Sequence, residues 1–278
     1  MSGAIGIDVG GTKIAAGVVD LDTGRVLHAE RLATAPERGG AAVLADCAGL
    51  AGRLGAPQLP VGVGICEMVD RDGRITSAET IEWRDLDVVG IGRGGTVVVE
   101  SDVRAAALAE ARFGAGAGLE SFLYAIVGTG ASVCLVLEGR PLLGARGNAI
   151  VLGSPPAELV ASGRAIAERT GVDARTAVTD PAHAVEVDYA VAVLGGVLAT
   201  LVNALDPDRL IIGGSLGLSQ PFFGRVAEAT RAGIEYPDTR RLRIVPSALG
   251  PDGGVVGAAL AAARRYGAPD VDRHRPVG

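Results

Sequence analysis

The sequence predicts an α/β protein made of two similar halves. A repeated hairpin, alternating strands and alanine-rich helices, and the lack of a linker all point to this. The first hairpin reads AIGIDVGGTKIAAGVVDLDTGR and the second LYAIVGTGASVCLVLEGR. Each is an apolar strand, a loop containing Gly-Thr, another apolar strand and a turn closing on Gly-Arg, which is typical of an internal duplication. On the repeat alone, an accidental likeness between two Gly/Val-rich hairpins stays open.

Composition narrows the class of protein. The 278 residues are 48% hydrophobic and carry a net charge of −6 without any run of Lys or Arg, which argues against nucleic acid as a partner. Three scattered cysteines predict neither a disulfide framework nor a CxxC metal site, as expected in the cytoplasm. No export signal is visible, and the apolar stretch 190–205 is short and interrupted. We therefore expect a cytoplasmic protein that does not bind membranes, with 190–205 as a buried helix.

The remaining elements follow from apolar runs and turn residues. Strands are expected at 61–65, 97–100, 122–127, 131–137, 210–212 and 242–245, and helices at 39–54, 103–113, 188–205, 221–232 and 255–265. No Pro/Ser-rich linker separates the halves, so we expect them to share a cleft. The predicted domains are 1–105, completed by helix 255–268, and 106–254, followed by a loose tail at 269–278.

The first hairpin loop has the residues of a phosphate site. Backbone N–H groups at Gly10 and Gly11 could face an anion, while Thr12 adds a hydroxyl and Lys13, the only lysine, adds a cation. Asp8 could hold Mg²⁺ through water. The loop lies between two strands, so it is not a Walker A motif. An ordinary turn with a solvated lysine is the alternative.

Two further glycine segments could line the same nucleotide site. Gly128, Thr129 and Gly130 form the matching loop of the second hairpin, and Gly213-Gly214 follows a strand. Gly-Thr-Gly alone is weak, and a plain strand-to-helix turn would also explain Gly213-Gly214.

Asp102 is the candidate catalytic base. It lies at a predicted strand-to-helix junction, where a carboxylate can face a cleft. Phosphoryl transfer to an alcohol needs a base that accepts the hydroxyl proton. In isolation, an N-cap role would be the better explanation of Asp102, and only a resemblance to a known family changes the balance.

Taken together, these motifs resemble the ROK family of bacterial sugar kinases and repressors over nearly the whole chain. The matching segments, in family order, are DVGGTK, GICEMVDRDGRITSAETIEWRD, ESDVRAAALAEARFGAGAG, VGTGAS, LLGARGNA, ASGRAIAER, IIGGS and LGPDGGVVGAAL. The resemblance implies an actin-like, hexokinase-type fold and transfer of the ATP γ-phosphoryl group to a sugar hydroxyl, with Asp102 as base. It also implies a homodimer and places Thr80, Asn148 and Glu158 at the acceptor.

The chain departs from the family around the acceptor. Ser101-Asp102 replaces the usual Asn-Asp, and Cys66-Glu67 replaces Pro-Gly. After Asn148 the chain reads IVLGS instead of Gly-Glu-x-Gly-His, and the zinc-binding CxCGxxGC segment has no counterpart. We therefore expect no zinc, and we read His28, His183 and His274 as surface residues.

These departures predict a kinase for a modified sugar, such as the amino sugar kanosamine, or a cyclitol, rather than for glucose. Ser101 and Glu67 join the acceptor residues, and a buried Glu67 would favour an ammonium group; Glu67 pointing to solvent is the alternative.

A non-catalytic sensor of sugar and nucleotide remains open. A repressor is disfavoured because the chain begins close to Asp8. An acyl kinase would need cations, for which only Arg104 and Arg146 are candidates.

Overall fold

The computed structural model describes residues 2–56, 58–84, 86–92, 97–152 and 157–265. Within this part, the chain divides into two compact units. Unit 1 runs to Ala109 and resumes at Gly254, and unit 2 is Glu110–Gly253. The predicted tail 269–278 and the end of the predicted helix 255–268 lie outside the described residues.

Unit 1 is built on a five-stranded sheet of order β3-β2-β1-β4-β5. β1 pairs antiparallel with β2 and parallel with β4, which in turn pairs parallel with β5. The strands are β1 (Gly3–Val9), β2 (Lys13–Asp20), β3 (Val26–Ala33), β4 (Val61–Ile65) and β5 (Val97–Ser101).

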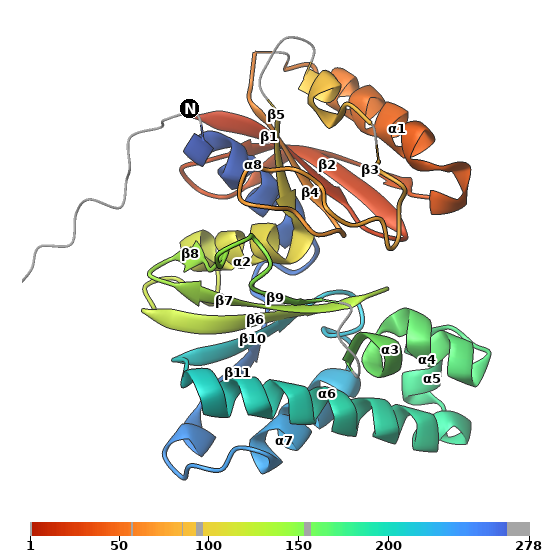
Figure 1. Ribbon diagram of the computed structural model, residues 1–278, viewed down its shortest axis with the longest axis vertical. Helices are drawn as coiled ribbons and strands as arrows, with labels where there is room; N and C mark the ends of the chain where they lie inside the picture. Colours follow the sequence, from red (N-terminus) through yellow and green to blue (C-terminus); the bar gives the residue numbers. More distant parts are fainter. Residues whose placement is uncertain (1, 57, 85, 93–96, 153–156, 266–278) are drawn as a thin grey trace, which may run out of the picture. The chain divides into compact units, whose positions relative to one another are not determined.

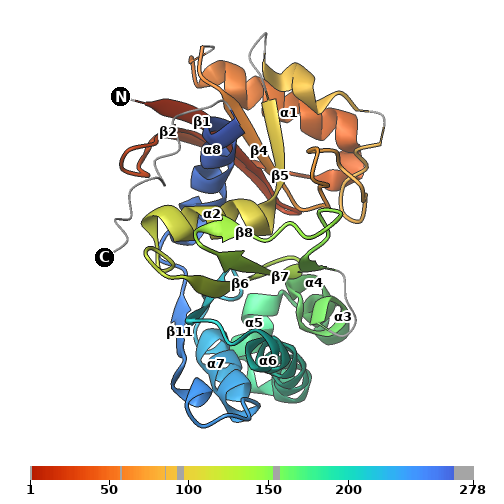
Figure 2. The same ribbon diagram turned by 60° about the vertical axis from the view of Figure 1, so that its left-hand side comes forward.

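Helices cover both faces of this sheet (Figures 1 and 2). On one face, α1 (Gly40–Arg53) packs Val43, Cys47 and Leu50 on the apolar residues of β1 and β4. On the other face, α8 (Gly253–Arg265) lies so close that a Cβ at Gly6 would come 1.9 Å from the Val255 carbonyl oxygen. Glycines thus let the backbone of α8 touch the sheet. The third helix, α2 (Asp102–Phe113), begins directly after β5.

Unit 2 repeats the plan with a six-stranded sheet, β11-β10-β6-β7-β8, in which β9 also pairs with β7. Read from the other end, β8-β7-β6-β10-β11 matches β3-β2-β1-β4-β5, with two antiparallel pairings and then two parallel ones. The strands are β6 (Ser121–Val127), β7 (Ala131–Leu137), β8 (Arg140–Pro141), β9 (Ile150–Leu152), β10 (Arg209–Gly213) and β11 (Arg243–Pro246). The duplicated α/β fold predicted from the two hairpins is confirmed.

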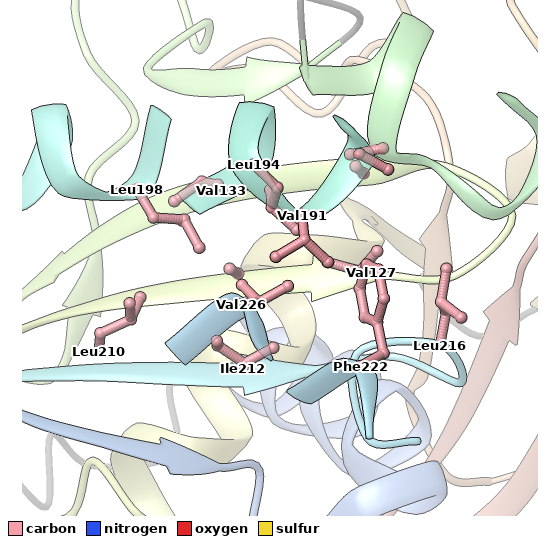
Figure 3. Packing of buried hydrophobic residues seen from close by; sticks show 14 of the residues in the cluster. Val127, Val133, Val191, Leu194, Leu198, Leu210, Ile212, Leu216, Phe222 and Val226 are labelled. Atoms are coloured by element: carbon pink, nitrogen blue, oxygen red, sulfur yellow. The ribbon is translucent and has the colours of Figure 1, made fainter. Parts of the chain in front are cut away.

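The core of unit 2 lies between this sheet and its helices. Figure 3 shows Val191 and Leu194 of α6 and Phe222 of α7 packed against Val127 and Ile212 of the strands. The helices are α3 (Ala157–Ala161), α4 (Gly163–Thr170), α5 (Ala174–Thr179), α6 (Ala184–Leu205) and α7 (Phe222–Ala232). Among the described residues, only the α6 region is long and apolar enough to cross a membrane, and its inner face belongs to this core.

The expected elements are present with small shifts at their ends, and several others were not foreseen. The predicted helix 188–205 begins four residues earlier, at Ala184. β3 escaped prediction because it is an edge strand without buried residues, so it lacks an apolar run. β8, β9, α3 and α5 are too short to show a period. Short 3-10 helices lie at Pro36–Arg38, Val88–Gly92, Pro181–His183, Thr239–Arg241 and Gly250–Asp252.

Candidate active site

The carboxyl ends of three neighbouring strands meet at one edge of the unit 1 sheet. Val9, Ile65 and Ser101 lie side by side, because Val9 pairs with Ile65 and Ile65 with Ser101. The residues that follow each strand are therefore neighbours too. This is the edge at which open α/β sheets bind ligands.

The first loop at this edge is anchored by a residue that the sequence reasoning missed. Thr34, fully buried, donates its hydroxyl to the Gly10 carbonyl at 2.7 Å and its backbone N–H to the Thr12 carbonyl at 3.0 Å. Gly10 N–H donates to the Lys13 carbonyl at 3.0 Å. Thr34 follows an exposed edge strand, and nothing in the sequence pattern marks it.

Asp8 is a partly buried carboxylate inside this arrangement. Burial raises its pKa to about 6, and the nearby positive charge of Lys13 opposes that rise. Gly254, at the start of α8, packs directly on it: a Cβ there would come 2.4 Å from Asp8 Cγ. The sequence reasoning gave Gly254 no role, although the glycine pair at the start of a helix was a signal of close approach.

Asp102 is the first residue of α2 and follows β5 directly. Its Oδ1 accepts a hydrogen bond from the Val103 N–H at 2.6 Å. Its backbone also lies near Gly64 of β4, where an added Cβ would be 3.8 Å from Asp102 Cα. Ser101, which ends β5, is only 1% exposed and presents almost no surface to an acceptor.

Glu67 follows β4 by two residues, is fully buried and does not point to solvent. Its Oε2 accepts from Ser77 Oγ at 2.5 Å and from the Glu79 N–H at 2.9 Å. Its Oε1 accepts from the N–H groups of Thr80 at 2.7 Å and Ile81 at 3.0 Å. The carboxylate therefore binds the loop 77–81.

Cys66 connects this loop to the rest of the site. Its sulfur is hydrogen-bonded by the Thr80 side chain and lies within electrostatic range of Asp102, Glu67 and Asp8. Burial, followed by these carboxylates in that order, raises the pKa of the Cys66 thiol well above its usual range. The predicted residues Asp8, Glu67, Thr80 and Asp102 are thus brought together within unit 1.

In unit 2, the loop 128–130 lies at the corresponding edge. The backbone N–H groups of Gly163 and Arg164, which begin α4, donate to the carbonyls of Gly128 and Thr129 at 2.8 and 3.1 Å. Ser162 caps this helix by accepting from the Ala165 N–H at 3.2 Å. The start of α4 therefore holds the loop.

Gly213-Gly214 forms the tight turn after β10. Gly214 has φ +85°, and a Cβ there would come 2.3 Å from the Val127 carbonyl oxygen. The N–H groups of Leu216 and Gly217 also donate to that oxygen, at 3.0 and 2.9 Å. The turn packs on the end of β6, so the fold itself requires Gly214.

Two predicted acceptor residues lie in unit 2. Glu158, on α3, accepts from the Ala131 N–H and pairs with Arg164 at 3.2 Å, so it is bound to the loop 128–130. Asn148 is exposed on the segment before β9. Of the stretch 150–154, where a departure from the family is predicted, 150–152 form β9 and the rest lies outside the described residues.

The two cations considered for an acyl kinase differ. Arg104 is 1% exposed, donates to Glu100 Oε1 at 2.6 Å and to the Val69 carbonyl at 2.6 Å, and so serves the interior of unit 1. Arg146 is exposed. Because Arg104 is buried and already donates to Glu100 and Val69, it is not placed to bind a carboxylate acceptor.

No group of three or more His, Cys, Asp or Glu side chains within the described ranges is placed to hold a metal ion. His28 is exposed and His183 partly exposed, whereas His274 lies outside those ranges.

Two α/β units with the same strand order define the actin-like class of two-domain proteins. A model of the ROK family matches residues 4–265, and the chain therefore belongs to the ROK family.

Solved structures and sequences similar to this chain are consistent with membership of the ROK family. The glucokinase of Streptomyces griseus, solved with glucose and AMPPNP, has a TM-score of 0.82 and 26% identity, covering 94% of this chain and 99% of that one. The ROK hexokinase of Thermus thermophilus has a TM-score of 0.76 and 32% identity, covering 95% and 99%. A glucokinase of Streptomyces coelicolor is 36% identical over 141 residues, 49% of this chain and 44% of the glucokinase. The matched part thus spans less than half the length of that relative.

Proposed function

We propose that this protein is an ATP-dependent kinase that transfers the γ-phosphoryl group to a hydroxyl of a hexose-like acceptor. The observation that carries the proposal is the carboxyl edge of β1, β4 and β5. There, a glycine loop and Asp8 lie on one strand end, and Asp102 lies two strands away. Family membership and the glucokinase solved with glucose and AMPPNP support the same reaction.

Asp102 is proposed to accept the proton of the attacking hydroxyl. Its position at the start of α2 fixes the backbone, because Ser101 ends a sheet strand and the Val103 N–H holds one carboxylate oxygen. The carboxylate therefore has a fixed place at the edge where the acceptor is proposed to bind. Positioning and charge neutralisation account for most of the catalysis in phosphoryl transfer, so a fixed base suffices.

Gly10 and Gly128 of the two loops differ from two nearby glycines in the reason why a glycine is needed at the position. A Cβ at Gly10 would meet nothing closer than 3.4 Å, and one at Gly128 nothing closer than 3.7 Å. At Gly163 and Gly213, by contrast, it would come 2.5 and 2.3 Å from other atoms of the fold. The fold explains the second pair but not the first. Close approach of phosphate oxygens to the backbone would explain Gly10 and Gly128.

Mg²⁺ is proposed to be held at Asp8, partly through water. The site fits: a carboxylate whose pKa is raised to about 6 by burial lacks sufficient positive charge around it, even with Lys13 nearby. A divalent cation would supply that charge and neutralise the phosphates. Thr12 and Lys13, both exposed, complete the phosphate side.

For the acceptor, we propose a hexose or a close analogue. The preference for a modified sugar or a cyclitol rested on the departures around the acceptor, and Glu67 motivated the amino-sugar version, such as kanosamine. Because loop groups already donate to both oxygens of Glu67, this residue gives no support for reading an ammonium group. Glucose, amino sugars and cyclitols therefore enter the test as equal candidates.

The test is a coupled ADP-release assay with ATP and Mg²⁺ across glucose, mannose, N-acyl and amino sugars, and cyclitols. Turnover of any of these, dependent on Asp102, is expected. A protein that binds sugar and nucleotide but transfers no phosphate would be the sensor instead.

We also propose a homodimer. The observation in its favour is on α6, where Val185 and Tyr189 are 78% and 56% exposed although the helix is strongly apolar. Light scattering after gel filtration tests it, and a monomer across the micromolar range would contradict it.

A further inference from the structure

Residues 67–81 form a small hairpin of their own in unit 1. Val69 pairs with Ile75, and the Thr76 N–H donates to the Met68 carbonyl at 2.8 Å. At the base of the hairpin, Ser77 Oγ accepts from the Met68 N–H at 2.9 Å and donates to Glu67. The chain then continues through residues 79–81, whose three consecutive N–H groups converge on the same carboxylate.

The hydrogen bonds of Glu67 are complete without a ligand. A carboxylate has about four lone-pair positions, and Glu67 receives four donors, two on each oxygen. Its side chain is also fully buried. A substrate group could reach it only by displacing one of these donors, which would then lose its hydrogen-bond partner. Glu67 therefore acts on the loop.

The loop that Glu67 holds lies next to the proposed base. Thr80, whose N–H is 2.7 Å from Glu67 Oε1, uses its side chain to bond the Cys66 sulfur. Cys66 and Asp102 directly follow Ile65 and Ser101, which pair at the ends of β4 and β5. On the other flank, Arg104 of the helix that starts at Asp102 donates to the Val69 carbonyl of the hairpin. Arg104 thus fixes the hairpin directly to α2, and Thr80 fixes it to Cys66, the residue after β4.

We propose that Glu67 is a positioning residue that orders residues 77–81, which we call the acceptor wall. By ordering this wall, Glu67 positions the predicted acceptor residue Thr80 relative to Asp102. This rests on the proposed kinase function. Because its side chain is fully buried, Glu67 holds this wall from within the protein. Glu67 is then indifferent to the charge of the acceptor.

The decisive variant is Glu67→Gln. Glutamine keeps the shape but offers only one accepting oxygen, and its NH₂ group faces two of the four donors. We expect hydrogen exchange of the amides in 77–81 to accelerate about tenfold or more, with exchange in the middle of α2 unchanged. The KM for the acceptor should rise about 10-fold to 100-fold while the KM for ATP stays the same. The KM should rise by the same factor for neutral sugars and for amino sugars.

The matched control is Glu37→Gln, the same chemical change at an exposed residue of unit 1. It should alter neither exchange nor kinetics. If Glu67→Gln fails to fold, Ser77→Ala removes one donor to Glu67 and should accelerate exchange in the same segment by a smaller factor.

Unchanged exchange at 77–81 in a folded Glu67→Gln or Ser77→Ala protein would overturn the inference. A loss confined to amino sugars would also overturn it, because it would make Glu67 a direct reader of charge. If the parent protein phosphorylates no acceptor, the proposed kinase function fails, and the exchange measurement still decides whether Glu67 orders the loop.

Discussion

The two units share a strand order but differ in chemistry at the corresponding edges of their sheets. In unit 1, this edge carries the carboxylates Asp8, Glu67 and Asp102 around Cys66. In unit 2, the edge is glycine and threonine, and its carboxylate Glu158 is taken up by the Ala131 N–H and Arg164. Among the described residues, the two units thus share a strand order, but three carboxylates gather at the edge of unit 1 and only the paired Glu158 lies at that of unit 2.

The difference follows from what each edge would have to bind. Carboxylates repel phosphate oxygens unless a cation stands between them, whereas backbone N–H groups and hydroxyls attract them. The glycine edge of unit 2 therefore suits nucleotide alone. The edge of unit 1 has its own phosphate loop at 10–13, and its carboxylates also suit a metal ion and a hydroxyl that must lose a proton. Each prediction below tests this division, from the largest effect to the smallest.

The largest effect is expected at Asp102. Asp102→Asn keeps the shape and can still accept from the Val103 N–H, but it is no useful base. We expect kcat to fall about 100-fold to 10,000-fold, with nucleotide affinity unchanged in calorimetry. The matched variant Asp72→Asn, at an exposed turn, should keep full activity. Full activity in Asp102→Asn would mean that the acidic edge does not perform the chemistry.

The next prediction compares two glycines of unit 2. Gly163→Ala should lower the free energy of unfolding by about 1 to 3 kcal/mol, because its Cβ would come 2.5 Å from the Gly128 carbonyl oxygen. Gly128→Ala has room, so its stability should stay within about 1 kcal/mol of the parent. It should instead raise the KM for ATP about tenfold.

Thermal unfolding and ATP titration measure the two effects separately. A Gly128→Ala protein with unchanged affinity for ATP would remove the argument that nucleotide demands this glycine.

The sequence predicted the hairpins, their loops and the strand-to-helix junction at Asp102, because apolar strands, Gly-Thr loops and such junctions are local patterns. It could not predict that Asp8 meets Gly254, because that contact joins residues from opposite ends of the chain. Glu67 shows the same limit more sharply. Its burial was foreseen as one possibility, but the donors that surround it are backbone groups, which leave no trace in the residue types.

The third prediction concerns pH. Burial raises the pKa of Asp8 from 3.8 to about 6, so the metal-free folded state holds a proton that the unfolded chain has released between those values. Stability from this group is complete below pH 4 and is lost as pH rises through about 6, by at most about 3 kcal/mol. Asp8→Asn should flatten that fall in denaturant titrations from pH 4 to 7. An unchanged slope would show that Asp8 is not the group responsible.

The smallest effect is expected in the rate at which iodoacetamide labels Cys66, the cysteine at the acidic edge. Burial and then the charges of Asp102, Glu67 and Asp8 raise the pKa of Cys66, so little thiolate exists at pH 8 although the residue is partly exposed. Iodoacetamide should therefore label Cys66 far more slowly in the folded protein than in urea. Asp102→Asn removes the largest of the charge contributions and should speed labelling by about tenfold or less. Mass spectrometry of the peptide containing Cys66 measures both rates. Equal labelling rates in the folded parent and Asp102→Asn proteins would mean that this carboxylate lies farther from the thiol than the acidic edge requires, and the contrast with unit 2 would weaken accordingly.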